Sequence, residues 1–267
     1  DWSSDVCSSD LTLRLLYQPG PRVIELKAIK LYVNSYRDPS PAGFDFARLL
    51  DAVGRVEGIR RVRFTTSHPR DFVKPIIDAI DDNPALCNHV HLPVQSGSTR
   101  VLSAMRRRYT RDQYLALVDD IRNRMPDVAL STDMIVGFPG ETAEEFDETL
   151  SLTDSVGFHS MFSFKYSPRP NTLADKRLPD DVPEETKTRR IVELQALQRT
   201  IQQHLHEEMV GQTLPVLIDA ASRRRNTELS GRTSQNIVVN LPGTPDWIGR
   251  TLPVTIERAG QIGRAHV

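Results

Sequence analysis

Residues 133–142 read DMIVGFPGET, and this stretch marks a change from β-strand to α-helix. Residues 129–136 are mainly apolar and β-branched, which predicts a strand. Thr142 and Glu145 have the spacing of a capping box, which predicts a helix over residues 142–156. Between the two, Gly137 and Gly140 permit a tight turn. The same glycines would let the backbone approach a flat nucleoside ring. The sequence leaves open whether they serve only the turn or also a nucleoside-binding site.

Strand and helix patterns alternate on both sides of this stretch. Apolar and β-branched runs predict strands over residues 23–33, 61–66, 89–94, 129–136 and 160–166. Apolar residues at helical spacing predict helices over residues 46–53, 72–80, 110–125 and 142–156. This alternation indicates an α/β fold with parallel strands, either a doubly wound sheet or a β/α barrel.

Polar or glycine-rich loops follow four of the predicted strands. They read TTSH (65–68), QSGS (95–98), GFPGE (137–141) and SPRP (167–170). Because the carboxyl ends of parallel strands lie on one edge, the four loops predict one shared site. Gln95 and Ser96 suit ribose hydroxyls or an amino-acid head group. Ser98 suits a helix cap, and His68 and His91 are candidate acids, bases or ligands, although a lone histidine more often serves in packing.

The pattern changes near residue 210. A proline-bearing stretch at residues 178–183 precedes a long predicted helix from residue 184 to about residue 209. Beyond Gly211, short apolar runs at residues 214–218, 237–241 and 252–256 are separated by turn residues. They predict a small all-β barrel of about five strands. We therefore expect two domains, over residues 12–210 and 211–261.

Both ends of the chain have the character of foreign segments. Residues 1–11, DWSSDVCSSDL, resemble a translated sequencing adapter, and residues 262–267, IGRAHV, raise the same suspicion. We expect neither segment to be native, and neither enters the fold prediction.

Composition narrows the class of protein. The chain is 39% hydrophobic and 26% charged, which is typical of a globular protein with a core. No apolar run approaches the roughly 20 residues that a membrane span needs, and no signal-peptide pattern is present, so the expected location is the cytoplasm.

The formal net charge is −1, but basic residues are clustered in two runs, at residues 106–108 and 223–225. Cys7 and Cys87 lack the spacing of a zinc or iron–sulfur site.

Five strings in one order carry a family resemblance. They are RFTTSHP (63–69), HLPVQSGS (91–98), MRRRYT (105–110), DMIVGFPGET (133–142) and SPRP (167–170). Over about residues 23–260 the chain resembles the radical-SAM methylthiotransferases. ELSGRT (228–233) and NIVVN (236–240) resemble their TRAM module. RFTTSHP favours the enzymes that act on tRNA over the relative that modifies a ribosomal protein.

This resemblance implies a partial, TIM-like β/α radical-SAM barrel lacking its first strand, followed by a small TRAM-like barrel. It also implies S-adenosylmethionine and two 4Fe–4S clusters as cofactors. The implied reaction adds a methylthio group to carbon 2 of an N6-isopentenyl-type adenosine next to the anticodon. The implied partners are the anticodon stem-loop of tRNA and a reductant such as flavodoxin or ferredoxin.

Two departures from the family pattern accompany the resemblance. The cysteine motif that binds the first cluster is absent, and so is the domain that holds the second. Residues 30–34, KLYVN, stand where relatives have Gly-Gln-Asn-Val-Asn. We expect a longer parent enzyme in an upstream reading frame, and we expect this chain alone to be inactive.

The resemblance also implies binding residues, while it leaves the catalytic residues unassigned. Ile135, Gly137 and Phe138 would lie near the adenine of S-adenosylmethionine, and its ribose and methionine would lie near the residues Ser67, Gln95, Ser96 and Arg169. The expected RNA contacts are Arg106, Arg107, Arg108, Arg223, Arg224, Arg225 and Arg232. Three alternatives stay open: a non-catalytic RNA-binding protein, a generic β/α-barrel enzyme, and a methylthiotransferase for another tRNA nucleoside or a ribosomal protein.

Overall fold

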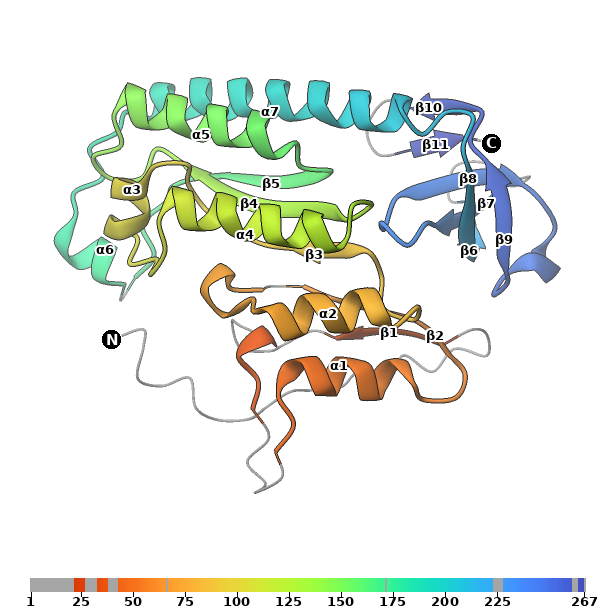
Figure 1. The fold of residues 1–267 in the computed structure, drawn as a ribbon. Helices are drawn as coiled ribbons and strands as arrows, with labels where there is room; N and C mark the ends of the chain where they lie inside the picture. Colours follow the sequence, from red (N-terminus) through yellow and green to blue (C-terminus); the bar gives the residue numbers. More distant parts are fainter. Residues whose placement is uncertain are drawn as a thin grey trace.

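The structure is a computed structural model that describes residues 22–26, 33–37, 43–65, 67–170, 172–222, 228–260 and 264–266 (Figure 1). Several sequence predictions fall outside these ranges. The basic run at residues 223–225, Cys7 and the adapter-like segment at residues 1–11 lie outside the described residues.

Five parallel strands form the centre of the larger domain in the described part of the chain. They are β1 (Arg22–Leu26), β2 (Ile59–Phe64), β3 (His89–His91), β4 (Ala129–Val136) and β5 (Ser160–Lys165). β1 pairs with β2, and β3, β4 and β5 pair in that order. A parallel bridge between Val62 and Leu86 joins β2 to the segment that leads into β3. Spatial order thus follows chain order, as in the partial barrel that the sequence predicts.

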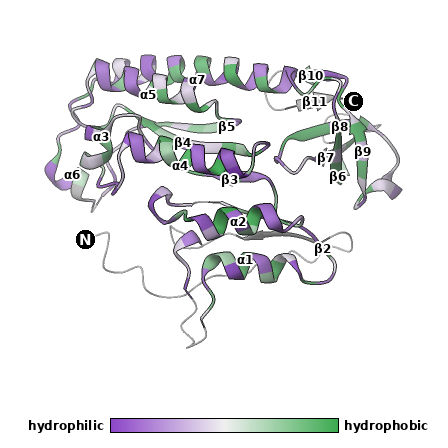
Figure 2. Cartoon of the chain, viewed as in Figure 1, coloured by the Kyte–Doolittle hydropathy of each residue, from purple (hydrophilic) through white to green (hydrophobic). Residues whose placement is uncertain are grey.

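Helices cover one face of these strands (Figure 1). They are α1 (Phe46–Gly54), α2 (Lys74–Asp82), α4 (Arg111–Arg124), α5 (Ala143–Val156) and α7 (Glu184–Glu207). The short helices α3 (Thr99–Ala104) and α6 (Leu173–Arg177) follow β3 and β5. Two turns of 3-10 helix, η1 (Val33–Ser35) and η2 (Pro69–Asp71), follow β1 and β2. Apolar side chains of both the strands and the helices form one buried core. Figure 2 colours the ribbon by the hydropathy of each residue, with hydrophobic residues in green.

The sequence predicted most of these elements and misplaced some of their ends. Both capping boxes form, Thr110 with Gln113 and Thr142 with Glu145. The helix predicted from residue 72 begins at Lys74, because residues 69–71 form η2 instead. The strand predicted over residues 89–94 ends at His91. The short helix α6 was not predicted, and α3 follows Ser98, which the sequence marked only as a possible helix cap.

A second sheet follows α7. Its strands are β6 (Thr213–Ala221), β7 (Glu228–Arg232), β8 (Val238–Pro242), β9 (Thr251–Thr255), β10 (Arg258–Gly260) and β11 (Arg264–His266), with the 3-10 turn η3 (Pro245–Trp247) before β9. Their order is β10-β11-β8-β7-β6-β9. The sheet has its own core, which includes Val216, Ile218, Val239 and Ile256. Within the described residues this is a curled six-stranded sheet, where the sequence predicted a barrel of about five strands.

Two positions in this sheet refine the sequence prediction. Gly231 lies where a Cβ atom would come within 2.6 Å of the Leu217 carbonyl oxygen, so close packing of β7 on β6 requires glycine there. Arg264–His266 belong to the tail that the sequence marked as foreign. They pair with β8 and β10 as part of the sheet.

The second sheet lies at the amino-terminal ends of the parallel strands. The backbone N–H of Asn88, just before β3, donates to Ser234 Oγ (3.0 Å), and Gln235 Nε2 donates to the carbonyl of Asp127, just before β4 (3.4 Å). The loops that follow the strands lie at the opposite end, with α3 and α6 (Figure 1). Among the described residues, no helix has the length and apolar character to cross a membrane.

Candidate functional site

The loops after β2, β3 and β4 meet at the carboxyl ends of the strands. The Ser67 N–H donates to the His91 carbonyl (3.4 Å), which joins the loop after β2 to β3. The Gln95 N–H donates to the Asp133 carbonyl and the Ile135 N–H donates to the Gln95 carbonyl, both at 2.9 Å, which joins the loop after β3 to β4. The shared edge that the sequence predicted is therefore present for these three loops.

Two residues at this edge, Ser67 and Gln95, have a side-chain or backbone feature that suggests a bound ligand. Ser67 is 2% exposed, and its hydroxyl has no hydrogen-bond partner within the described residues. Gln95 is buried with φ +76°, a backbone conformation that costs an ordinary residue energy. Buried hydroxyls usually have partners, and strained residues gather at binding sites, so both observations point to this edge.

Ser96, in contrast, is fully buried against α5. Its hydroxyl accepts a hydrogen bond from the Ser98 N–H (3.2 Å) and lies 3.5 Å from Thr149 Oγ1. A Cβ atom at Gly97 would lie 2.4 Å from the Glu148 carbonyl oxygen, so the loop needs glycine to pack on α5. Ser98 precedes α3 as its N-cap, but its side chain makes no cap hydrogen bond there. These residues hold the loop in place, and a ligand contact from Ser96 stays a prediction.

The GFPGE turn has a structural role in addition to any binding role. Gly137 and Gly140 adopt φ +71° and φ +72°. The Gly137 N–H donates to Glu141 Oε2 (2.6 Å), and the Glu141 N–H donates to the Phe138 carbonyl (2.9 Å). Phe138 is 4% exposed and its ring meets the Tyr166 ring edge-on at 5.1 Å. Of the three residues expected near adenine, only Ile135 is partly open to solvent.

The strands present an inner face on the side away from the helices. On β4, Leu130, Thr132, Met134 and Val136 are fully buried, and Met134 and Val136 belong to the core shared with the helices. Ser131, Asp133 and Ile135 alternate with them and point to the inner face.

Two exposed aromatic side chains extend this face onto β5. The register pairs Asp133 with Phe162 and Ile135 with Phe164, so all four side chains share the face. Phe162 and Phe164 are 62% and 52% exposed. Large exposed aromatics grouped on one face are typical of a binding surface. The sequence analysis missed them, although SMFSFK (160–165) places the two Phe residues at the alternating spacing of one strand face.

A hydrogen-bonded chain of polar side chains lies beside these aromatics. Ser131 Oγ lies 3.1 Å from His89 Nε2 and 3.0 Å from His91 Nδ1. His91 Nε2 lies 3.5 Å from Asp133 Oδ1, and the His91 ring is edge-on to Phe162 at 6.5 Å. Burial lowers the pKa of His89 to about 3, so its imidazole is neutral at physiological pH. The inner face thus combines apolar rings with groups that donate and accept hydrogen bonds.

His68 has a structural role at the edge of the site. Its backbone exchanges two hydrogen bonds with the Asn34 amide, at 2.8 and 2.9 Å, and its Nδ1 accepts from the Arg70 N–H (3.2 Å). Burial, with a further contribution from nearby Arg107, lowers the pKa of His68 to about 4. A neutral, hydrogen-bonded His68 fits the packing role that the sequence left open.

The basic run at residues 106–108 borders the same edge. Arg106 adopts φ +57°, and the Arg106 and Arg107 N–H groups donate to the carbonyls of Ser103 and Leu102. These two bonds form a Schellman motif at the end of α3, where glycine is usual. Arg106 and Arg108 are exposed.

The other predicted arginines lie at separate places. Arg169 is exposed in the segment after β5. Arg232 lies in the second sheet, where its Nε is 3.4 Å from Asp219 Oδ2 and its Nη1 donates to Asn236 Oδ1 (3.0 Å). A role of Arg169 or Arg232 in binding stays a prediction.

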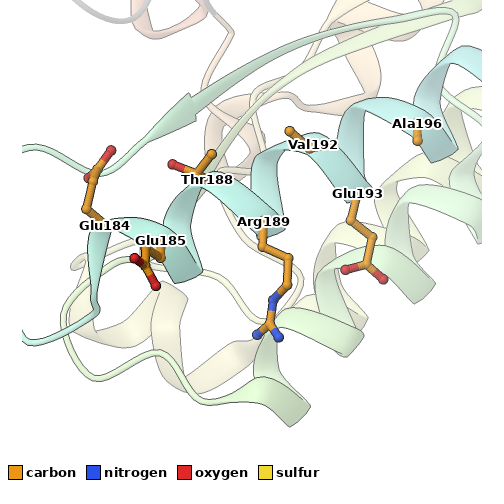
Figure 3. A pocket seen from close by; sticks show the side chains of 7 residues that line it. All are labelled: Glu184, Glu185, Thr188, Arg189, Val192, Glu193 and Ala196. Carbon is orange, nitrogen blue, oxygen red and sulfur yellow. The ribbon is translucent and has the colours of Figure 1, made fainter.

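A pocket of about 570 Å³ opens on the outer face of α7 (Figure 3). Its lining residues all belong to that helix: Glu184, Glu185, Thr188, Arg189, Val192, Glu193 and Ala196. None of the predicted site residues lines it, so this pocket is separate from the strand-end loops.

Comparison with known proteins places the chain in a family. The Radical SAM superfamily matches residues 29–153, and the TRAM domain matches residues 207–261. A tRNA-2-methylthio-N(6)-dimethylallyladenosine synthase of Solibacter usitatus is 51% identical over 240 residues, which cover 88% of this chain and 54% of the relative. A protein of the same name in Syntrophotalea carbinolica is 45% identical over 247 residues, which cover 92% and 56%. The chain belongs to the radical-SAM methylthiotransferase family.

The chain spans about half the length of the curated relatives it matches. Its second sheet lies within the residues that match the TRAM domain, and we refer to it below as the TRAM-like sheet. Among solved structures, coproporphyrinogen III oxidase of Escherichia coli, a radical SAM enzyme, superposes with a TM-score of 0.45 at 15% identity. That superposition covers 65% of this chain and 46% of the other, and it adds nothing to the family assignment.

The residues of this chain suit one of the family's two kinds of cofactor, S-adenosylmethionine, and do not suit the other, the iron–sulfur clusters. The sequence has only two cysteines, and no group of three or more His, Cys, Asp or Glu side chains in the described ranges is placed to hold a metal ion. The chain's own residues therefore do not form a cluster site of the cysteine type. The unpartnered Ser67 hydroxyl at the strand ends fits a polar ligand such as S-adenosylmethionine.

Proposed function

We propose that this chain is the cofactor-binding and RNA-binding part of a tRNA methylthiotransferase. The reaction adds a methylthio group to carbon 2 of an N6-isopentenyl-type adenosine next to the anticodon. The names of the relatives support this choice, and one structural observation carries it. Two exposed rings, Phe162 and Phe164, lie beside the polar pair His91 and Asp133 on the inner face, next to the loops that bear the family's motifs.

The inner face suits an unstacked adenine. Bases taken out of a helix commonly stack on aromatic side chains, which Phe162 and Phe164 offer. The Asp133 carboxylate would accept a hydrogen bond from an amino group, and the exposed rings also suit an apolar substituent such as isopentenyl.

The strand-end loops suit S-adenosylmethionine. Ser67, Gln95 and Ser96 would orient its ribose and methionine, together with Arg169. Ile135, Gly137 and Phe138 would lie along its adenine. When bound, S-adenosylmethionine and the 4Fe–4S clusters supply the radical, the methyl group and the sulfur. Cluster ligands and the reductant, such as flavodoxin or ferredoxin, would come from outside this chain, and the site of action would be the cytoplasm.

The anticodon stem-loop of tRNA would be held by the TRAM-like sheet and by two groups of arginines. Arg106, Arg107 and Arg108 would meet phosphates beside the strand-end loops, whereas Arg223, Arg224, Arg225 and Arg232 would meet them from the TRAM-like sheet.

Two measurements on the full chain test this function. Binding of an anticodon stem-loop should weaken linearly with the logarithm of salt concentration, and a stem-loop bearing the isopentenyl group should bind more tightly than one without it. Calorimetric titration with S-adenosylmethionine should give saturable binding that is weakened by Ser67→Ala. RNA binding without any binding of S-adenosylmethionine would favour a non-catalytic RNA-binding protein instead. RNA binding that is absent or independent of salt would exclude both.

A further inference from the structure

The turn between β7 and β8, residues 233–237, enters the amino-terminal end of the parallel strands. Ser234 Oγ accepts from the Asn88 N–H (3.0 Å) just before β3, and Gln235 Nε2 donates to the Asp127 carbonyl (3.4 Å) just before β4. Asn236 Oδ1 accepts from Arg63 Nη1 on β2. One short turn therefore contacts β2 and the segments that lead into β3 and β4, and we call this contact the seam.

A second arginine of β2 closes the seam from the other side. Arg61 Nη2 donates to the Pro215 carbonyl (3.1 Å), and its Nη1 donates to the Arg232 carbonyl. Burial lowers the pKa of Arg61, which means that its guanidinium has lost much of its water. Separation of the two domains would break these two hydrogen bonds and leave water as the partner of the half-buried guanidinium.

Asn236 is held in one orientation at the centre of the seam. Its φ is +66°, a conformation that asparagine tolerates better than most residues, and its N–H donates to the Thr233 carbonyl (3.1 Å). Its Oδ1 accepts from Arg63 of the barrel and from Arg232 of the TRAM-like sheet (3.0 Å). One amide oxygen thus links a cation from each domain.

The covalent connection alone would not fix this geometry. α7 ends at Glu207 and β6 begins at Thr213, and the segment between them is a turn about which the sheet could pivot. α7 also contacts β10 (Figure 1). The seam adds a contact at a different point of the sheet, and two separated contacts restrict rotation where one does not.

We propose that the seam is a positioning interface that sets which nucleotide of a bound RNA reaches the strand-end loops. The seam lies before β3 and β4, and the loops follow the same two strands at their opposite ends. β4 has eight residues. A strand of that length spans about 26 Å at the usual rise per residue. RNA held by the docked TRAM-like sheet must cross the inner face, past Phe162 and Phe164, over this fixed length. This inference rests on the proposed RNA-binding function.

Spin labels test the rigidity of the seam in the full chain. Val73→Cys in the larger domain and Ile248→Cys in the TRAM-like sheet give two exposed labels, in a background where Cys7 is replaced by serine and Cys87 stays buried.

The unaltered seam should give one narrow distance distribution. Asn236→Gly, which keeps the positive φ available, and Ser234→Ala should together broaden it. Thr213→Ala, an exposed position of β6 outside the seam, should leave it narrow. A broad distribution with the seam intact, or a narrow one in the seam variant, would overturn the proposal.

Photo-crosslinking tests the consequence for RNA. An anticodon stem-loop with 4-thiouridine placed at successive loop positions should crosslink to Phe162 or Phe164 from one position. The seam variant should keep the stem-loop affinity but spread the crosslinks over several positions. Crosslinks that stay at one position in the seam variant would refute the positioning role. If the unaltered chain binds no RNA, the proposed function fails, whereas the spin-label distances still decide whether the seam is rigid.

Discussion

Arg190 on α7 and Glu141 in the turn after β4 form an ion pair that is closed off from solvent. Arg190 Nη1 lies 2.7 Å from Glu141 Oε2, and the two side chains are 6% and 0% exposed. Glu141 Oε2 also accepts from the Gly137 N–H (2.6 Å). The pair therefore ties the turn that carries the GFPGE motif to the longest helix of the chain.

Arg190→Leu should lower the free energy of unfolding by about 3–5 kcal/mol, because it leaves a buried carboxylate without its cation. Burial already raises the pKa of Glu141, and Arg190 opposes that shift, so the variant should also bind a proton more readily. Urea denaturation measures the loss. Arg55→Ala is the control, because Arg55 pairs with Asp51 with its side chain 70% exposed and should change the free energy of unfolding little. Equal losses would contradict the role of burial.

Gly137→Ala should destabilise the protein more than Gly140→Ala does. Both glycines have positive φ, so alanine at either position costs about 1–2 kcal/mol of backbone strain. At Gly137 the new Cβ would also lie 2.4 Å from Lys187 Cγ, whereas at Gly140 the nearest contact is 3.8 Å away. The steric clash should add about 1–3 kcal/mol at Gly137. Thermal or urea denaturation of the two variants, side by side, measures this difference, and indistinguishable variants would disprove the clash.

Arg106→Gly should stabilise the fold while it weakens RNA binding. Glycine removes the strain of a positive φ at the end of α3, a gain of about 1 kcal/mol. Loss of one phosphate contact should reduce the slope of log affinity against log salt by about 0.9. Arg108→Ala should reduce the slope in the same way without a gain in stability. A slope that is unchanged in both variants would remove this run from the RNA interface.

Phe162→Ala and Phe164→Ala should each weaken binding of an isopentenyl-bearing stem-loop by about 1–3 kcal/mol, the usual contribution of one stacked base. Their stability should change little, because both rings are more than half exposed. Fluorescence titration measures the affinity. Val192→Ala changes an equally exposed apolar residue on α7 and should leave binding unaltered. Normal affinity in both phenylalanine variants would mean that the base does not lie on the inner face.

Acid should destabilise the protein through buried histidines. Burial lowers the pKa of His89 to about 3, and those of His68 and His159 to about 4. In the unfolded chain these groups titrate near 6.5, so the unfolded state takes up more protons below that pH. The stability that they contribute is present above pH 6.5 or so and is lost as the pH falls toward about 4, at about 1.4 kcal/mol per unit of pKa shift.

The melting temperature between pH 7.5 and pH 5 measures this loss. His159→Phe should make the decline shallower, because it removes one of the groups that gain a proton on unfolding. A melting temperature that does not change over this range would rule out the neutral, buried state of these histidines.

Local patterns in the sequence were enough to predict the elements on which the fold is built. The Thr142–Glu145 capping box and the apolar run before Gly137 placed α5 and β4 almost to the residue, because capping and strand alternation depend on near neighbours. The same reasoning placed Ser67 and Gln95 at one edge, since parallel strands bring their carboxyl ends together. The family, too, was recognisable from ordered motifs, and the relatives bear it out.

Long-range packing decided what those patterns left open. Ser96 packs against α5, and Glu141 pairs with Arg190, which lies forty-nine residues away in the sequence. These partners are neighbours only in the folded chain. The grouping of Phe162 with His91 and Asp133 depends on the register of β5 against β4, and the contact of Asn236 with Arg63 depends on how one domain docks on the other. Spacing along a chain encodes turns and faces, whereas register, docking and burial depend on contacts between residues distant in sequence. The sequence by itself therefore determined the elements, their parallel order and the family, and only the tertiary structure decided which of their side chains meet.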